Sequence, residues 1–310
     1  MRHILVIRYG GFGDMILSMG AFRSVRAHHA ADHVTMLTTR RFADLLRQSG
    51  YFDKVLIDDR LKPWQLAGWV SQARQLRGER FDRVYDLQRN ERTTVLYRVM
   101  TAGRPVEWSG VSRGCSHYVR DNPDDRRHIT ERLAEQLAVA GIPEMLPPDL
   151  GWLTGEIGHF GLPPAYALIV PGGAPHRPEK RAPAEAFAGL GRYLVGQGII
   201  PVLLGTDSER GQIDAIRVAC PGAIDLSGRT GFGDIADLAR GAVGAVGNDT
   251  GAMHLAAAVG CPSLVLFSAA SDPRRVSPQG RRVHILETET LRDLRTERLI
   301  AAWQELCGDR

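Results

Sequence analysis

Asn248-Asp249-Thr250-Gly251-Ala252-Met253-His254 follows a short apolar run, 242–246, and opens an alanine-rich segment, 255–259. The pattern predicts a strand, a tight turn and a helix in that order. The turn therefore sets an Asp, a Thr and a Gly at a helix N-terminus, where unpaired backbone N–H groups and the positive end of the helix dipole attract phosphate. Thr250 and His254 are spaced i, i+4, so they share one face of the first turn and can point at one ligand. The segment predicts a site for a phosphate-bearing substrate.

The same alternation of strand and helix extends over the whole chain. In the first half we predict strands at 3–8, 34–38, 54–57 and 83–87, and helices at 15–28, 41–48 and 66–76. In the second half we predict strands at 166–170, 199–204, 223–225, 242–246 and 263–267, and helices at 184–196, 209–219, 232–240, 251–259 and 291–306. This order is typical of α/β proteins with doubly wound parallel sheets, which bind ligands at the carboxyl ends of their strands.

Two stretches that contain helix- and strand-breaking residues separate the two halves of the chain. A Pro-rich passage at 143–148 ends one helix, and Gly161-Leu162-Pro163-Pro164 precedes a new strand. A chain of 310 residues with 44% hydrophobic content has enough apolar side chains for two cores. We therefore predict two Rossmann-like domains facing a central cleft, one at 1–155 and one at 156–290.

Composition narrows the class of function. The formal net charge of +4 suits anionic small molecules or a membrane surface, and the absence of a short basic cluster interleaved with aromatics disfavours nucleic acid. The four cysteines, Cys115, Cys220, Cys261 and Cys307, form no CxxC pair, so neither a disulfide framework nor a zinc site is indicated. No apolar run approaches the ~18 residues of a membrane span, and no signal-peptide core follows Met1. We expect a soluble cytoplasmic protein, for which docking on a membrane surface stays open.

Tyr9-Gly10-Gly11-Phe12-Gly13-Asp14 follows the first predicted strand. The glycines allow close backbone approach to a ligand, and Asp14 stands at a helix start, where it is either a cap or a catalytic base. A dinucleotide fingerprint is the rival interpretation. It lacks its third glycine, since Ile16 holds that position, and the second strand ends in Thr39-Arg40 instead of an acidic residue. Only an NADP variant, through Arg40, stays formally open.

Two more strand ends carry polar loops. The first runs Pro171-Gly172-Gly173-Ala174-Pro175-His176-Arg177-Pro178-Glu179-Lys180-Arg181, and its Lys180 either neutralises a departing phosphate or is a solvated surface lysine. The second is Leu203-Leu204-Gly205-Thr206-Asp207-Ser208-Glu209, in which Glu209 suits recognition of a ribose hydroxyl. Capping by Asp207 or Ser208 explains part of this second loop equally well.

These motifs, in this order, resemble those of the heptosyltransferases of glycosyltransferase family nine. Gly13-Asp14 matches the family's N-terminal motif, Pro171-Gly172-Gly173 with Lys180 matches its lysine loop, and Asp249-Thr250-Gly251-x-x-His254 matches its Asp-Thr-Gly-x-x-His signature in full. The chain departs from the family pattern at Gly20, at Ala182 and in the turn Ser268-Ala269-Ala270-Ser271. The resemblance implies a GT-B fold, in which a closing helix commonly crosses back onto the first domain. That placement is expected for 291–310.

The resemblance also implies an activity, namely inverting transfer of a heptose from ADP-heptose to a lipopolysaccharide inner-core or related glycan acceptor, with no required metal or cofactor. Asp14 becomes the general base, and Asp249 contacts the sugar or organises its turn. Lys180 and the helix start at Thr250-Gly251 hold the diphosphate near His254. Glu209 meets the nucleoside. The remaining donor-binding residues are Gly13, Gly172, Gly173 and Thr206. The partners implied are the nucleotide-sugar donor and a glycan or glycolipid acceptor, with peripheral contact with the cytoplasmic face of the inner membrane left open.

Acceptor binding is assigned to arginines of the first half, because guanidinium groups suit carboxylates and phosphates. We select Arg89, Arg92 and Arg120, while the nearby Arg113, Arg126 and Arg127 share their chemistry and all six have ordinary surface charge as the alternative. Two other functions stay open: a GT-B-fold sugar-nucleotide epimerase and a non-catalytic sugar-nucleotide-binding module.

Overall fold

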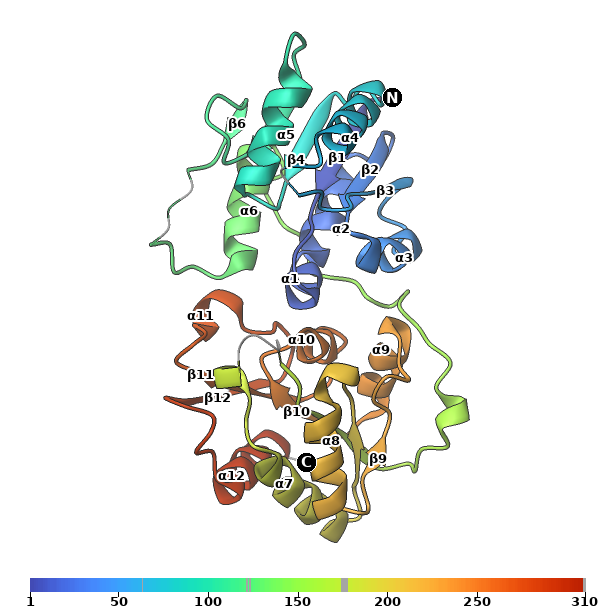
Figure 1. Ribbon diagram of the computed structural model, residues 1–310, viewed down its shortest axis with the longest axis vertical. Coiled ribbons are helices and arrows are strands. Elements are labelled where there is room, and N and C mark those ends of the chain that lie inside the picture. Colours follow the sequence, from blue (N-terminus) through green and yellow to red (C-terminus); the bar gives the residue numbers. More distant parts are fainter. Residues whose placement is uncertain (63, 121, 123, 174–177, 309–310) are drawn as a thin grey trace. The chain divides into compact units, whose positions relative to one another are not determined.

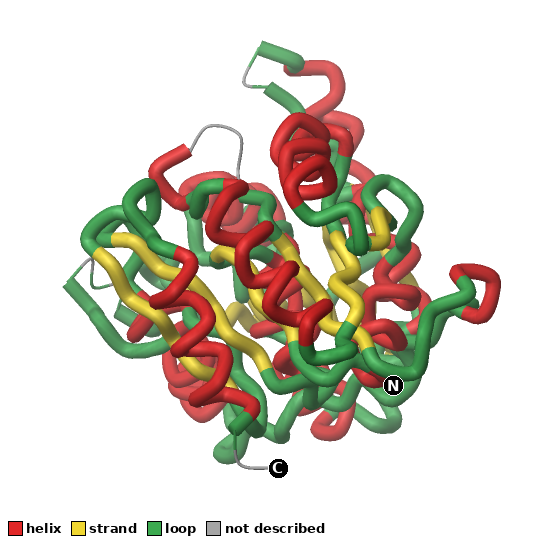
Figure 2. Tube along the Cα trace, turned by 90° about the horizontal axis from the view of Figure 1, so that it is seen from below, coloured by secondary structure: helices red, strands yellow, loops and turns green. Residues whose placement is uncertain are grey.

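The computed structural model describes residues 1–62, 64–120, 122, 124–173 and 178–308. The chain divides into two compact units. The first comprises Met1–Gly11 and Ser18–Trp152, and the second comprises Phe12–Leu17 and Leu153–Arg310. The main division thus follows Trp152, close to the predicted boundary after 155. Each unit is a layer of strands flanked by helices (Figure 1, Figure 2).

The first unit is built on a parallel sheet of six strands in the order β3-β2-β1-β4-β5-β6. Its strands are β1 (His3–Ile7), β2 (His33–Thr38), β3 (Lys54–Ile57), β4 (Arg83–Asp86), β5 (Glu107–Gly110) and β6 (His117–Tyr118). Its helices are α2 (Met19–His28), α3 (Arg40–Gln48), α4 (Leu66–Gly78), α5 (Glu91–Thr101) and α6 (Ile129–Val139). The run from Ile4 to Ile7 is fully buried because β1 lies in the middle of the sheet with helices on both faces.

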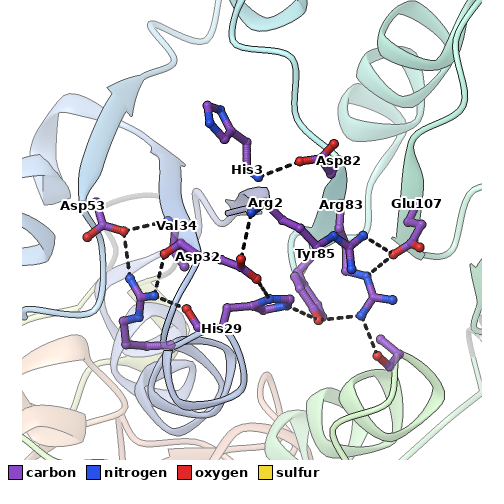
Figure 3. Close-up of polar contacts among 12 residues, drawn as sticks. Arg2, His3, His29, Asp32, Val34, Asp53, Asp82, Arg83, Tyr85 and Glu107 are labelled. Atoms are coloured by element: carbon purple, nitrogen blue, oxygen red, sulfur yellow. Dashed lines mark hydrogen bonds and ion pairs between the residues drawn. The ribbon is translucent and has the colours of Figure 1, made fainter.

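A polar network closes the amino-terminal side of this sheet (Figure 3). Glu107 accepts hydrogen bonds from Arg2 at 2.7 Å and from Arg83 at 2.5 Å, and Arg83 also donates to the Tyr85 hydroxyl at 3.2 Å. The same hydroxyl lies 2.9 Å from Nε2 of the buried His29. This network ties β1, β4 and β5 together at the sheet edge opposite to the carboxyl ends of the strands, where ligands bind in such folds.

The second unit repeats the plan, with six parallel strands in the order β12-β11-β10-β7-β8-β9. Its strands are β7 (Tyr166–Val170), β8 (Ile200–Leu203), β9 (Ile224–Asp225), β10 (Ala245–Asn248), β11 (Ser263–Ser268) and β12 (Val283–Thr288). Its α-helices are α7 (Ala184–Gly196), α8 (Arg210–Ala219), α9 (Phe232–Gly241), α10 (Gly251–Ala258), α11 (Pro273–Val276) and α12 (Thr296–Cys307), and α1 (Phe12–Leu17) groups with them. Three short 3₁₀ turns are η1 (Gly158–Phe160), η2 (Pro178–Lys180) and η3 (Asp207–Glu209).

Alternate residues of β7 point into two separate cores. Ala167 and Ile169 pack with side chains of α7, α8 and α12, whereas Leu168 and Val170 pack with side chains of α9 and α10. The last helix, which was predicted to pack back on the first domain, contributes to a core of the second unit, and its contact with the first domain stays a prediction. Leu299, Ala302, Trp303 and Leu306 of α12 are buried in the second unit's own core, because the apolar face of this helix meets the α7 side of the sheet.

The predicted helix at 15–28 is in fact two helices. Residue Ser18, with φ −90° and ψ −5°, separates α1 from α2, and the two belong to different units. Strands β5, β6 and β12 were not predicted. Strands β5 and β6 are short and rich in polar residues, and β12 is a half-exposed strand at the sheet edge, so none has the apolar run that identifies a buried strand.

Candidate functional site

The polar loops of the second unit meet at one edge of its sheet. In the strand order, β11, β10, β7 and β8 are consecutive neighbours, and all run parallel. Their carboxyl ends lead into Ser271, Asp249, the loop that begins at Pro171, and Thr206 respectively. A set of turns far apart in the sequence is therefore gathered at the side of an α/β sheet where ligands bind.

Lys180 and Asp249 form a salt bridge at the centre of this edge. The Lys180 ammonium lies 3.2 Å from Asp249 Oδ2 and donates to Ser271 Oγ at 2.7 Å. The Ser271 hydroxyl donates in turn to Asp249 Oδ2 at 3.0 Å, and His254 Nε2 lies 3.4 Å from Asp249 Oδ1. Only 15% of the Lys180 side chain is exposed. Lys180 is therefore not the solvated surface lysine that was the alternative interpretation.

The charge state of Asp249 follows from these neighbours. Burial acts to raise its pKa, but the hydrogen bond with His254 and the charges of His254 and Lys180 outweigh this effect and hold the pKa below its ordinary value. Asp249 is thus a carboxylate at neutral pH, and it compensates the buried ammonium group beside it.

Asn248 holds the two ends of the lysine loop. Its side chain is fully buried, and Nδ2 donates to the carbonyls of Pro171 at 2.6 Å and Gly172 at 3.0 Å. Its Oδ1 accepts from the N–H of Ala182 at 3.1 Å. The predicted loop residues Ala174, Pro175, His176 and Arg177 lie outside the described residues. One amide thus satisfies backbone groups before and after Lys180, and it sets where the loop leaves and rejoins the sheet.

The start of α10 presents unpaired polar atoms. Thr250 is the N-cap residue, yet its side chain makes no capping hydrogen bond, and its Oγ1 is buried without a partner in the described part of the chain. Within the same described residues, Nδ1 of the buried His254 also lacks a partner. Buried polar atoms are normally hydrogen-bonded, and a helix N-terminus offers further free N–H groups. This arrangement suits an anionic ligand with several acceptor oxygens.

Helix α1, which carries Asp14 in its first turn, packs on α10 within the second unit. A Cβ at Gly13 would lie 2.8 Å from Cδ2 of His254, and one at Gly251 would lie 2.5 Å from Cδ1 of Phe12. The Phe12 ring also contacts the Phe232 ring, with centroids 4.4 Å apart. Glycines at both positions therefore permit the close approach of the two helices, and Gly13 is next to the histidine of the predicted donor site.

The Thr206–Glu209 turn is satisfied internally. Glu209 Oε2 accepts from the Thr206 N–H at 2.8 Å and from its hydroxyl at 2.7 Å, and Oε1 accepts from Ser208 Oγ at 2.5 Å. The Glu209 side chain also fills the space beside Gly172, where a Cβ would lie 2.8 Å from its Cγ. This is a capping box with Thr206 as the N-cap residue and Glu209 as its partner, so the cap is neither Asp207 nor Ser208. Recognition of the nucleoside by Glu209 stays a prediction.

In the first unit, Gln88 holds the turn that precedes α1. Its Oε1 accepts from the N–H groups of Tyr9 at 2.8 Å and Gly10 at 3.1 Å. Gly10 has φ +29°, a conformation that side chains rarely adopt. The N–H groups of Gln88 and Arg89 donate to Asp86 Oδ1 at 3.1 and 3.0 Å. Two turns at the carboxyl ends of β1 and β4 are therefore connected by hydrogen bonds.

The predicted acceptor arginines differ in what they contact. Arg92 forms a two-point salt bridge with the buried Asp58 and lies over the Trp69 ring, 4.2 Å from its centroid. The guanidinium group of Arg92 therefore has a structural role within the first unit. Arg89 is in a left-handed turn with φ +55°, and Arg120 is exposed. Arg127 binds Asp125 and Glu135, and Arg40 binds Asp59 on the surface.

Among the residues that the structure describes, no group of three or more His, Cys, Asp or Glu side chains could hold a metal ion. None of the helices in that part of the chain has both the length and the hydrophobicity to cross a membrane.

Sequence reasoning missed the roles of Asn248, Ser271 and Gln88. Asn248 stands inside the quoted motif, and Ser271 stands in a turn that departs from the family pattern, so both positions were conspicuous. Nothing in the local sequence indicates their hydrogen-bond partners that lie 66 to 91 residues away along the chain. These partners are Ala182, Pro171 and Gly172 for Asn248, and Lys180 for Ser271.

Comparison with known proteins places these residues in context. The model of glycosyltransferase family 9 (heptosyltransferase) matches residues 69–300. Lipooligosaccharide heptosyltransferase 2 of Haemophilus influenzae is 32% identical over 119 residues, which is 37% of this chain and 34% of that protein. The chain thus aligns with about a third of this curated relative.

Two solved structures share the fold over nearly the full length. The ADP-heptose lipopolysaccharide heptosyltransferase II of E. coli superposes with a TM-score of 0.78 and 22% identity, covering 99% of both chains. A family 9 glycosyl transferase from Veillonella parvula superposes with a TM-score of 0.84 and 21% identity, covering 100% of this chain and 98% of that one. The predicted two-domain α/β architecture of the GT-B type is thereby confirmed.

Proposed function

Because this chain belongs to glycosyltransferase family 9, we propose that it is an inverting glycosyltransferase that moves a heptose from ADP-heptose to a lipopolysaccharide inner-core or related glycan acceptor. Support for the donor comes from the E. coli structure, which is described as an ADP-heptose heptosyltransferase. Support for the acceptor class comes from the curated relative, a lipooligosaccharide heptosyltransferase.

The observation that carries the proposal is the polar cluster at the carboxyl edge of the second sheet. The departing ADP acquires negative charge on its diphosphate as the bond to the sugar breaks. Lys180 brings a positive charge to this edge, and the start of α10 brings N–H groups and the Thr250 hydroxyl, which has no partner among the described residues. Preorganised donors of this kind stabilise developing charge because they need no reorganisation during the reaction. In this proposal they supply the stabilisation that a metal ion supplies in other transferases.

We assign Asp14 as the general base that takes the proton from the acceptor hydroxyl. Inversion requires the acceptor to attack from the face opposite to the leaving group, with a base on the acceptor side. Asp14 lies in the first turn of α1, next to Gly13 at the His254 ring. We further propose that the enzyme acts in the cytoplasm, where nucleotide sugars are made, and meets a glycolipid acceptor by peripheral contact with the membrane.

The test is Asp14→Asn, which keeps the size of the side chain and removes the base. We expect the turnover number to fall by about 10² to 10⁴, with ADP affinity unchanged. Asp44→Asn, at an exposed carboxylate paired with Arg47, is the matched control and should leave both quantities unchanged. Turnover is measured as ADP release with a heptose-deficient glycolipid, and affinity by calorimetry. Equal loss of turnover and affinity in Asp14→Asn would contradict the role of base.

The same assay distinguishes the two other functions. An epimerase changes the sugar nucleotide when no acceptor is present, so product analysis without acceptor detects it. A binding module binds ADP but transfers sugar to no glycan.

A further inference from the structure

Ser271 lies at the centre of the polar cluster, and the proposed function assigns it no role. Its hydroxyl oxygen lies 2.7 Å from the Lys180 ammonium nitrogen and 3.0 Å from Asp249 Oδ2. An ammonium group has only donors and a carboxylate only acceptors. The hydroxyl must therefore accept from Lys180 and donate to Asp249, which fixes the direction of both hydrogen bonds.

The three residues come from three different strand ends. Lys180 follows β7, Asp249 follows β10, and Ser271 follows β11 through the 268–271 turn. Ser271 is 91 residues from Lys180 and 22 from Asp249 in sequence, so these contacts depend on the tertiary fold. The N–H of Ser271 also donates to the Ser268 carbonyl at 3.0 Å, which anchors the turn on the end of β11.

We propose that Ser271 is a positioning residue of the donor site, whose hydroxyl holds the Lys180 ammonium and the Asp249 carboxylate in one arrangement. This inference rests on the proposed function for its catalytic consequence, but not for the positioning itself. Ser271 acts through Lys180, and no direct contact with substrate is required.

The physical reason lies in the flexibility of lysine. Its ammonium group ends a four-carbon chain with many rotamers, and its three N–H donors rotate freely. With Asp249 alone, the ammonium can move around the carboxylate, because a point charge has little directional preference. A second hydrogen bond from a side chain anchored on another strand restricts this motion. A cation that is already in place stabilises a leaving group better than one that must first be ordered.

The composition of the chain offers a direct test, because it has three lysines, Lys54, Lys62 and Lys180. Competitive labelling of the full-length protein with trace acetic anhydride, read by mass spectrometry, reports how accessible and how mobile each amine is. In the wild type we expect Lys180 to react more slowly than Lys54, since their side chains are 15% and 43% exposed. In Ser271→Ala we expect the rate at Lys180 alone to rise about tenfold, the scale of a lost hydrogen bond to a charged group.

Three further variants make the result specific. Ser271→Thr keeps the hydroxyl and should keep Lys180 slow, whereas Ser271→Cys keeps the size but weakens the hydrogen bonds and should behave as Ala does. Ser227→Ala removes a serine–aspartate hydrogen bond of 2.5 Å to Asp225 elsewhere in the same unit, and it should leave Lys180 slow. A higher labelling rate at all three lysines would show that the variant is unfolded. If Ser271→Ala behaved in this way, the comparison of Ser271→Thr with Ser271→Cys would test the proposal instead. An unchanged Lys180 rate in the folded Ala or Cys variant overturns the proposal.

A second arm separates this inference from the proposed function. Labelling with saturating ADP should protect Lys180 in the wild type, and the ADP affinity of Ser271→Ala should be about tenfold weaker. If Ser271 controls the Lys180 rate while ADP protects nothing, the positioning role stands and the assignment of an ADP donor fails. If ADP protects Lys180 while the Ser271 variants match the wild type, the positioning role fails and the donor site stands.

Discussion

At the scale of single residues, Asp86 shows the sharpest conflict between burial and charge. It is fully buried at the end of β4, and its Oδ2 has no hydrogen-bond partner in the described part of the chain. Burial raises the pKa of Asp86 to about 6, an effect that Thr93 and the N–H groups of Arg89 and Gln88 only partly offset. The residue nevertheless orders the turn from which Gln88 reaches the backbone of Tyr9 and Gly10.

This pKa predicts a pH dependence of stability. Between about pH 4, where the unfolded carboxyl ionises, and pH 6, the folded state binds more protons than the unfolded state. The free energy of unfolding should therefore fall as the pH rises through this window, by up to about 3 kcal/mol from this group. Urea denaturation of the wild type and Asp86→Asn at several pH values checks the prediction. The Asp86→Asn variant should lack this fall in the free energy of unfolding. If the free energy of unfolding depended on pH in the same way in both proteins, the prediction would be wrong.

At the scale of elements, the contact between α1 and α10 depends on two glycines. Gly13 faces the His254 ring, and Gly251 faces the Phe12 side chain, so neither position has room for a Cβ. The contact matters because α1 carries Asp14 and α10 carries Thr250 and His254. The packing of α1 on α10 therefore holds the helix that carries the proposed base beside the helix that carries the proposed donor site.

Gly251→Ala should separate these helices. We expect the added methyl group to displace Phe12, to destabilise the protein by about 1–3 kcal/mol and to lower the turnover number more than the ADP affinity. Gly211→Ala is the matched control, since a Cβ there meets open space on α8. Thermal unfolding and the turnover assay provide the measurements. A stable and fully active Gly251→Ala variant would show that the close approach is not needed.

At the scale of the whole molecule, the chain forms two units, each with its own parallel sheet and its own cores. The proposed donor residues Lys180, Asp249, Thr250 and His254 all lie in the second unit, and α1 groups with them. A ligand that binds only there should stabilise that unit directly.

We therefore predict that ADP at about 100 times its dissociation constant stabilises the second unit by about 2.7 kcal/mol. Amide hydrogen exchange should show added protection at the carboxyl ends of β7, β10 and β11. GDP and UDP at the same concentration serve as controls and should protect less. Protection by ADP that is confined to β1 and β4 of the first unit would place the nucleotide elsewhere.

Local sequence was sufficient for the features that depend on neighbours along the chain. Apolar runs such as 166–170 predicted strands, and the turn from Asn248 to Gly251 predicted the start of a helix, because periodicity and capping are short-range effects. The phosphate-binding character of that helix start stays a prediction. The family and the two-domain α/β fold followed from the order of these motifs, and both are confirmed.

Only the tertiary structure decided which side chains meet. It showed that Lys180 pairs with Asp249 and Ser271, that Asn248 holds the lysine loop, and that Arg92 pairs with Asp58. It also placed the apolar face of α12 in a core of the second unit. These contacts depend on strand order and on the packing of whole elements, and a local pattern of residues contains no information about partners that lie 34 to 91 positions away.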